Sequence, residues 1–335
     1  MADIGVVYLY RFAEGEQPAR AFLNSYRAHP AGVDHDLHVI FKGFPDAPAL
    51  ASARTVFADL LINPIELDDT GFDVGSYFAA AKFVSNRRLV FFNTFTELLA
   101  DDWLKKFDAA LSLPEAGLVG ATGSWQSRSS YYEAIIGMAW ARVSHLLRRL
   151  TEFAAGGRHP KESQDVRVGG EDGQDAQGVD KRRIIALVGR GFNRLFRFDR
   201  YLMYLCHYAR YPNPHVRTNA FMIERDRFLS LRAPSFKEKY GVYKFESGRQ
   251  SMTKQIVAQG LKPVVVGSNG KFYNTSEWKS SSTFWVNEQA NLIAADNRTR
   301  QYASATEEGR ARFQDYAWVP PSSWTYKAHR VPLEN

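Results

Sequence analysis

The sequence predicts an α/β fold with a mainly parallel sheet flanked by helices. Five short runs of Val, Ile, Leu and Phe are hydrophobic without alternation, as expected for strands that are covered on both faces. Helical stretches separate the first of these runs, and strands that alternate with helices form parallel, doubly wound sheets. The expected strands are 4–10, 37–41, 89–92, 117–120 and 263–267, and the expected helices are 17–27, 49–57, 73–85, 100–111 and 131–153.

Composition sets the class of protein. Of the 335 residues, 45% are hydrophobic and 24% are charged, which allows a large core and argues against global disorder. Cys206 is the only cysteine, so an internal disulfide is excluded and a reducing, cytoplasmic location is expected. No stretch has the length of a membrane span. The net charge of +7 favours an anionic partner, but no nucleic-acid-binding module accompanies it, so nucleic acid is not expected.

The middle of the chain differs from the rest. Residues 154–181 are rich in Gly, Asp and Gln, which predicts a mobile loop or lid between a front half, residues 1–153, and a back half, residues 182–335. The back half opens with a basic amphipathic stretch, residues 183–202. A packed helix with a solvated basic face and a helix on an anionic membrane surface both fit this stretch.

The segment 69–75 reads Asp-Thr-Gly-Phe-Asp-Val-Gly and lies between an extended piece and a helix. Gly71 allows the backbone to approach a ligand, and Asp69 and Asp73 supply carboxylates for the hydroxyls of a ribose or for a base. The start of the helix offers N–H groups to a diphosphate. A plain strand-to-helix turn capped by Asp73 fits the same residues.

A second candidate lies where the expected strand 89–92 ends in Asn93 and Thr94. Ligands of open α/β sheets collect at the carboxyl ends of strands, which places both side chains at a binding site. The alternative is a helix N-cap made by Thr94 or Thr96.

Glu246 is the candidate general base, because a partly desolvated carboxylate before a flexible turn can take a proton from an attacking hydroxyl. The alternative is an acid that stabilises a helix N-terminus. His215, beside Arg217, is a second candidate base or diphosphate contact, and a packed structural histidine is its alternative.

Residues 271–302 combine aromatic and amide side chains. Rings beside amides suit stacking on sugars and hydrogen bonding to hydroxyls, so Trp278 and Trp285 are candidate sugar-binding residues. A C-terminal segment whose rings belong to the core fits equally well.

The order of these motifs resembles that of GT-A-type bacterial glycosyltransferases of the rhamnan-synthesis and polysaccharide-assembly type. Those enzymes carry an Asn-x-Gly-x-Asp-Ile-Gly-like motif, and here Asp69 stands in place of Asn. The resemblance runs through the Lys42-Gly43-Phe44 loop, the segment 69–75, the strand that ends at Asn93-Thr94, the segment 214–221 and the turn 224–226.

The resemblance implies a GT-A-like, Rossmann-like sheet with a C-terminal acceptor-side extension, and an inverting hexosyltransferase. Residues 1–153 are then the nucleotide-sugar-binding half, for a UDP-, GDP- or dTDP-linked donor, and residues 182–335 the acceptor-side half. The implied acceptor is a glycan or lipid-linked glycan of bacterial surface polysaccharide, at the inner face of the cytoplasmic membrane. The resemblance implies that Glu246 and His215 are catalytic and that Trp278 and Trp285 bind the acceptor. The implied donor-binding residues are Lys42, Asp69, Gly71, Asp73, Asn93, Thr94, Arg217 and Arg249.

The sequence differs from the pattern of these enzymes at the position where many of them bind a metal. Many GT-A enzymes hold Mg or Mn with an Asp-x-Asp at the end of the central strand, where this chain has Asn93-Thr94-Phe95. Neutral oxygens are poorer ligands than carboxylates for such hard cations. Lys42, Arg217 or Arg249 could neutralise the diphosphate instead.

Two other functions fit parts of the sequence. The run Val119-Gly120-Ala121-Thr122-Gly123 suggests an NAD(P)-dependent oxidoreductase, although Gln126 stands where a third glycine is needed and the run follows the fourth strand instead of the first. The second alternative is a non-catalytic carbohydrate-binding or polysaccharide-assembly protein that has kept the fold. The missing Asp-x-Asp motif is consistent with this alternative.

Overall fold

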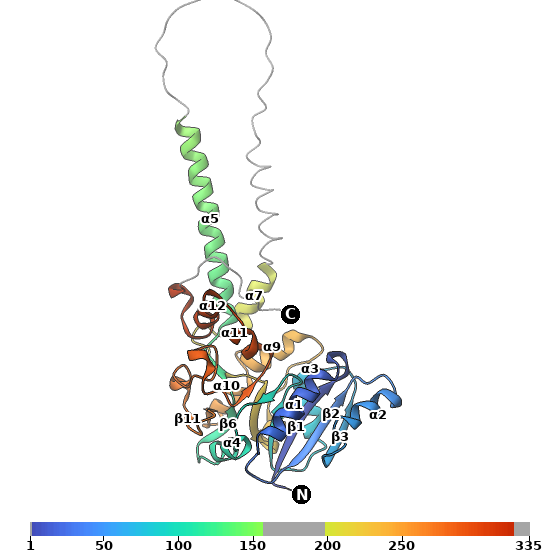
Figure 1. Ribbon diagram of the computed structural model, residues 1–335. Coiled ribbons are helices and arrows are strands. Elements are labelled where there is room, and N and C mark those ends of the chain that lie inside the picture. The colour runs from blue at the N-terminus through green and yellow to red at the C-terminus, as the bar shows by residue number, and fades with distance from the viewer. Residues whose placement is uncertain (1, 157–197, 325–335) are drawn as a thin grey trace, which may run out of the picture. The chain divides into compact units, whose positions relative to one another are not determined.

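The computed structural model describes residues 2–156 and 198–324 (Figure 1). The chain divides into two compact units, one made of Met1–Ser130 and His207–Asn335, the other of Tyr131–Cys206. The expected lid at 154–181 lies outside the described residues from 157 onward, as does the basic stretch up to residue 197. Of the helices in the described ranges, none combines the length and the hydropathy that a bilayer crossing requires.

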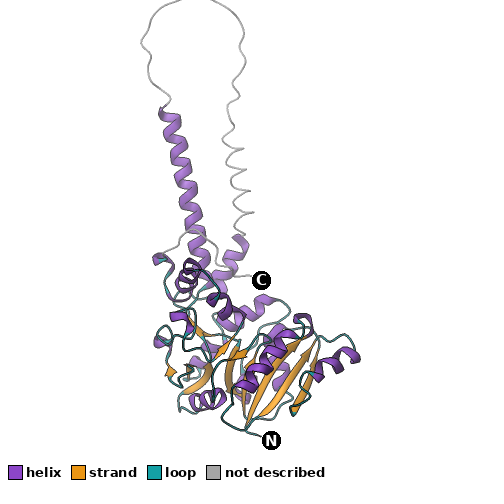
Figure 2. Ribbon diagram, viewed as in Figure 1, coloured by secondary structure: helices purple, strands orange, loops and turns teal. Residues whose placement is uncertain are grey.

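An eight-stranded sheet forms the centre of the larger unit, in the order β11-β10-β6-β9-β4-β1-β2-β3. Figure 2 shows its strands with helices packed around them. Antiparallel pairing is confined to β9 (Ala220–Glu224) and β11 (Phe272–Tyr273). The parallel strands are β1 (Ile4–Arg11), β2 (Asp36–Lys42), β3 (Ile62–Leu67), β4 (Arg88–Phe92), β6 (Ala116–Gly120) and β10 (Lys262–Val266). The predicted α/β fold with a mainly parallel sheet is confirmed, and the five predicted strands coincide with β1, β2, β4, β6 and β10.

One face of this sheet is covered by α1 (Gln17–Ala28), α2 (Ala47–Thr55) and α4 (Trp103–Leu111). Alternate residues of β1, including Val6 and Tyr8, belong to the same buried cluster as Phe22, Ala53 and Phe107 of these helices. The rings of Tyr8 and Phe22 stack at 3.8 Å between centroids. Burial of each large side chain contributes about 1.5–3 kcal/mol, so this layer fixes the helices on the sheet.

The opposite face is covered by α3 (Phe72–Ala81), α8 (Arg225–Ser230) and α9 (Lys239–Ser247). Phe91 of β4 lies 4.9 Å from the ring of Tyr77 and 4.8 Å from that of Phe228. Phe78 contacts Phe245 edge-on at 5.4 Å. Both faces of the strands are therefore buried, which explains their continuous hydrophobicity.

The C-terminal part of the larger unit continues through α10 (Met252–Ala258), α11 (Asn297–Ala303) and α12 (Glu307–Trp318). Two small sheets tie it to the N-terminal part, because β12 (Ala294–Ala295) pairs with β5 (Glu97–Leu98) and β8 (His215–Val216) pairs with β7 (Gly123–Ser124). Short 3-10 helices lie at Phe12–Glu14, Thr275–Glu277, Asn287–Gln289 and Pro321–Ser323.

The smaller unit contains most of α5 (Arg128–Gly156) and of α7 (Phe198–His207). Within this unit, the rings of Tyr132 and Tyr204 stack at 4.3 Å. The predicted helix 131–153 lies within α5.

Candidate active site

A cavity of about 1220 Å³ runs along the carboxyl edge of the parallel strands. Its lining includes Arg11 at the end of β1, Lys42 at the end of β2, Asp69 after β3 and Asn93 after β4. Because β9 runs antiparallel to β4, its amino end reaches the same edge and adds Asn219. Ligands of open α/β sheets bind at this edge, so the topology alone marks the cavity as the candidate site.

Asp69 is held between two cations at one part of the cavity. The Arg11 guanidinium donates hydrogen bonds to both carboxylate oxygens, each at 2.7 Å, and these bonds hold the pKa of Asp69 below its ordinary value. Lys42 Nζ lies 4.0 Å from Asp69 Oδ1 and donates to the carbonyl of Phe72. The Lys42 side chain is 1% exposed, and burial lowers its pKa. Lys42 therefore orders the 69–73 turn in addition to lining the cavity.

The turn before α3 adopts left-handed backbone at two consecutive residues, Gly71 (φ 77°) and Phe72 (φ 54°). Such backbone suits Gly and strains Phe, and strained residues concentrate at functional sites. The Phe72 carbonyl accepts hydrogen bonds from Lys42 and from Ser76 Oγ. Gly43 also has positive φ, and a Cβ there would lie 2.7 Å from the Cβ of Asp69. Both loops are thus packed closely around the carboxylate.

Asp73 lies in the first turn of α3, and Gly71 is the N-cap residue. The Asp73 carboxylate accepts a hydrogen bond from the N–H of Val74 at 2.8 Å. Burial raises the pKa of Asp73, and the negative charge of Glu246 adds to this increase. Asp73 thus hydrogen-bonds to the first turn of α3 without being its N-cap residue, and its carboxyl interacts with that of Glu246 inside one cavity.

Glu246 lies in the last turn of α9, so its interpretation as an acid at a helix N-terminus is wrong. Its Oε2 accepts hydrogen bonds from the N–H and the hydroxyl of Thr218, at 2.9 and 2.7 Å. Burial opposes ionisation of Glu246, but the charge of Arg217 and the hydrogen bonds from Thr218 outweigh it, and the pKa lies below the ordinary 4.5. Glu246 is therefore a carboxylate at neutral pH, and within the described ranges its Oε1 receives no hydrogen bond.

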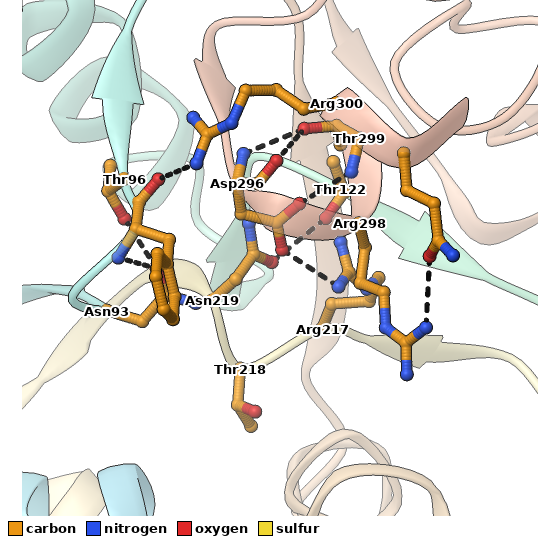
Figure 3. A network of polar contacts seen from close by, with 12 residues as sticks. Asn93, Thr96, Thr122, Arg217, Thr218, Asn219, Asp296, Arg298, Thr299 and Arg300 are labelled. Atoms are coloured by element: carbon orange, nitrogen blue, oxygen red, sulfur yellow. Dashed lines mark hydrogen bonds and ion pairs between the residues drawn. The ribbon is translucent and has the colours of Figure 1, made fainter. Parts of the chain in front are cut away.

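Asn93 and Thr94 form a tight turn at the centre of the carboxyl edge. Asn93 Oδ1 accepts hydrogen bonds from the Phe95 N–H and the Thr96 hydroxyl, at 3.1 and 3.0 Å (Figure 3). The Thr94 carbonyl accepts a hydrogen bond from the buried hydroxyl of Tyr8. Because α4 begins only at Trp103, the helix N-cap interpretation of Thr94 and Thr96 is wrong.

Arg217 and Asp296 form a buried ion pair beside Asn219. Arg217 Nη2 lies 2.9 Å from Asp296 Oδ2, and the two side chains are 11% and 1% exposed (Figure 3). The Arg217 guanidinium also stacks 4.5 Å above the ring of Phe284. Asp296 caps α11 by accepting from the Thr299 N–H. Arg217 is thus held rigidly in the cavity wall.

His215 does not line the cavity. It is 2% exposed, and its Nδ1 lies 2.8 Å from the carbonyl of Asn213, which fixes the proton on Nδ1. Burial lowers the pKa of His215 despite the nearby Glu246 carboxylate, so the ring is neutral at pH 7. A direct contact with substrate does not fit this placement, although the ring interacts electrostatically with Glu246.

Three further predicted residues have different placements. Trp285 lines the cavity and stacks on Phe284 at 4.4 Å. Trp278 does not line it, since the indole is fully buried and its N–H donates to the Tyr273 carbonyl. Arg249 is exposed and lies outside the cavity lining. Trp278 therefore has no face for a sugar ring, and Arg249 does not fit the donor-binding role.

Sequence reasoning missed several residues that line the cavity, namely Arg11, Arg128, Asn219, Asp296 and Arg298. Arg11 ends β1 at the carboxyl edge, so the rule that was applied to Asn93 would also have found it. The other four come together only through tertiary contacts, and their local sequence carries no signal of this.

Several oxygens of this cavity that could coordinate a divalent metal are already engaged within the protein. Among residues 2–156 and 198–324, no group of three His, Cys, Asp or Glu side chains is arranged to hold a metal ion. Asp69 is paired with Arg11 and Asp296 with Arg217, and the side-chain oxygen of Asn93 already accepts two hydrogen bonds. Hard cations need several oxygens that are free to coordinate.

The glycine-rich run 119–123 does not form the dinucleotide-binding turn that the oxidoreductase alternative requires. Gly123 belongs to β7, which pairs with β8, so the run 119–123 does not lead into a helix as a dinucleotide-binding turn must. A Cβ at Gly123 would lie 2.5 Å from the ring of Trp278. This glycine accommodates a packed indole in place of a pyrophosphate.

No family model and no curated protein matches the chain. Solved structures that match include a mannosyltransferase from Pyrobaculum calidifontis in complex with GDP-Man and Mn2+, with 14% identity and a TM-score of 0.30, covering 38% of this chain and 36% of that chain. S. aureus TarS 1–349 in complex with UDP-GlcNAc matches with 15% identity and a TM-score of 0.29, covering 36% and 34%. Mouse xyloside xylosyltransferase 1 matches with 16% identity and a TM-score of 0.27, covering 39% and 57%. The chain covers less than two thirds of the length of each of these structures.

Proposed function

We propose that the chain is a glycosyltransferase that moves a sugar from a nucleotide-sugar donor to a hydroxyl acceptor. The observation that carries this proposal is that one cavity contains both a carboxylate base and a buried cation with an unused donor. Glu246 is anionic and offers Oε1, while the buried Nη1 of Arg217 has no hydrogen-bond partner among residues 2–156 and 198–324. Glycosyl transfer needs a base at the attacking oxygen and positive charge at the departing diphosphate.

The donor nucleotide is expected over the ends of β1, β2 and β3, where Arg11, Lys42 and Asp69 line the cavity. Arg11 and Lys42 fix the orientation of the Asp69 carboxylate, so its oxygens are ordered acceptors for ribose or base N–H and O–H groups. The diphosphate is expected near Asn93 and Arg217, at the centre of the carboxyl edge.

The reaction is proposed to be a direct displacement with inversion. The acceptor oxygen forms a bond to the anomeric carbon while the bond from that carbon to the diphosphate oxygen breaks. Glu246 takes the acceptor proton, and the electron pair of the broken bond leaves with the nucleoside diphosphate. Arg217, which lines the same cavity, is proposed to stabilise the added negative charge. The hydrogen bonds from Thr218 fix the orientation of the Glu246 carboxylate.

The acceptor is expected on the side of the cavity formed by the C-terminal part of the larger unit. Trp285 and Tyr316 line this part with aromatic surface, which suits sugar rings. We propose a glycan or a lipid-linked glycan as acceptor, as in the polysaccharide-assembly enzymes that the motifs resemble.

Titration calorimetry with UDP, GDP, dTDP and CMP, in buffer that contains Mg and Mn, tests the donor site. At least one nucleotide should bind, and the matching nucleotide sugars should then be consumed with release of the nucleotide. If none of the four binds, the proposal fails. If the nucleotide sugar binds but is neither hydrolysed nor transferred to any glycan acceptor offered, a non-catalytic carbohydrate-binding protein replaces it.

A further inference from the structure

Three arginines from separate segments line the same cavity. Arg128 begins α5, Arg217 precedes β9 and Arg298 lies in α11. Burial lowers the pKa of Arg298, and the positive charges of Arg217 and Arg128 lower it further. Like charges that interact inside a partly buried cavity destabilise the protein unless an anion joins them. The arrangement is therefore that of a site for a multiply charged anion.

Two of the three cations, Arg128 and Arg217, are held in place by aromatic rings. The Arg128 guanidinium lies 3.7 Å above the ring of Tyr243, and that of Arg217 lies 4.5 Å above Phe284. Arg217 is fixed further by Asp296. Positioning before the ligand arrives reduces the entropy cost of binding.

Unsatisfied hydrogen-bond donors mark the same place. Within the part of the chain that the structure describes, three buried nitrogens in the cavity lining lack a hydrogen-bond partner, namely Arg217 Nη1, Gln126 Nε2 and Asn219 Nδ2. A buried donor without an acceptor costs about 1–3 kcal/mol, so a ligand is expected to supply acceptors. All three groups donate, which calls for a ligand rich in oxygen acceptors, such as a diphosphate.

The overall charge of the cavity lining also favours an anionic ligand. Seven Lys and Arg side chains line the cavity against five Asp and Glu side chains. Two of those carboxylates, Asp69 and Asp296, are ion-paired with arginines. A protein-held divalent cation therefore finds few available ligands, whereas an anion finds a surplus of positive charge.

We infer that Arg217, Arg298 and Arg128 bind the donor's diphosphate and stabilise its departure in place of a divalent cation, so that transfer requires no metal. This inference rests on the proposed function. As the glycosidic bond breaks, the leaving oxygen gains a negative charge, and the guanidinium groups are already positioned to hydrogen-bond to it. Arginine suits this role because its planar group pairs with two phosphate oxygens at once.

The test is a calorimetric titration of the full-length protein with inorganic pyrophosphate in EDTA. Pyrophosphate is expected to bind without metal, and Arg298→Gln is expected to raise its Kd at least tenfold. Removal of one of three repelling charges relieves repulsion, so this variant is expected to fold, as a thermal unfolding curve would verify. Arg232→Gln is the matched control, because Arg232 is exposed and absent from the cavity lining, and its Kd should stay within twofold of wild type.

Three results overturn the inference. They are no pyrophosphate binding in EDTA, an Arg298→Gln effect no larger than that of Arg232→Gln, and donor turnover that stops in EDTA and returns with Mg or Mn. In each of these three cases a nucleotide sugar can still bind or react when metal is present. None of the three results therefore contradicts the proposed glycosyltransferase function. Conversely, failure of all four nucleotides to bind removes the proposed function, whatever pyrophosphate does.

Discussion

The hydroxyl of Tyr8, in the middle of β1, donates a hydrogen bond of 2.9 Å to the carbonyl of Thr94, in the turn that follows β4. Tyr8 is fully buried and stacks on Phe22, so the core of the sheet directly fixes the turn at the centre of the cavity. Burial raises the pKa of Tyr8 well above the ordinary 10.0, which keeps this donor protonated at every working pH.

Tyr8→Phe is therefore expected to lower the free energy of unfolding by about 1–3 kcal/mol, because the Thr94 carbonyl loses its partner. Urea unfolding measures this loss, and calorimetry should show weaker nucleotide binding as the turn loosens. Tyr26→Phe is the control, since Tyr26 also loses a hydrogen bond, to His35, away from the cavity lining. Equal nucleotide affinity in both variants would contradict the role of this bond in positioning the turn.

Glu246→Gln is expected to lower kcat by about 10²–10⁴-fold while nucleotide affinity stays within a few-fold. The amide oxygen can still accept from Thr218, so the fold should be kept, but the amide cannot take a proton. Steady-state kinetics with the donor found by calorimetry measures the effect. Glu115→Gln is the matched control, because Glu115 lies before β6, at the opposite edge of the sheet, paired with Lys262. An unchanged kcat for Glu246→Gln would remove Glu246 from the reaction.

The pH dependence of kcat follows from the lowered pKa of Glu246. A base works only when ionised, and a pKa below 4.5 keeps Glu246 ionised from pH 5 upward. The rate is therefore expected to show no acid limb between pH 5 and 8. A rate that falls with a midpoint near 6 or 7 would instead indicate a different base.

Asp73→Asn is expected to stabilise the protein at neutral pH. The pKa of Asp73 is higher in the folded protein than the ordinary 3.8, so folding favours the protonated carboxyl and the charged form opposes it. Stability is lost as pH rises above 3.8, and at pH 7 the whole penalty applies. The amide removes this charge and still accepts from Val74, for a gain of about 1 kcal/mol.

Urea unfolding at pH 7 and at low pH checks this sign. The gain of Asp73→Asn should be present at pH 7 and shrink as the wild-type carboxyl becomes protonated. The same variant should bind nucleotide less well, because Asp73 lines the cavity. Destabilisation at pH 7 would show that the carboxylate is favourably paired instead.

Hydrophobic pattern was enough to predict most of the sheet. The runs that form β1, β2, β4, β6 and β10 belong to the central sheet and are buried on both faces. Their tertiary environment therefore favours the same strand conformation that their hydrophobic sequence favours locally. The rule that ligands lie at the carboxyl ends of strands placed Asn93 and Thr94 at the site, while the 69–75 motif and the family resemblance added Asp69 and Lys42, and all four line one cavity.

Residues outside that rule were harder to predict. Arg298 follows a helix-capping Asp, and its local sequence is that of an ordinary exposed helix start. Trp278 and Trp285 look alike in sequence, but Trp278 is packed against Gly123 whereas Trp285 lines the cavity. Such choices depend on partners that are distant along the chain, which a single sequence does not reveal.

The position of β9 between β4 and β6 has a consequence for synthesis on the ribosome. Until Ala220–Glu224 leaves the exit tunnel, both neighbouring strands keep an unpaired edge, and such edges invite pairing with other chains. At about 5–20 residues per second, several seconds pass between the emergence of β6 and that of β9. The nascent chain is therefore expected to need shielding during this interval, and a product truncated before residue 220 would have exposed strand edges and an incomplete cavity.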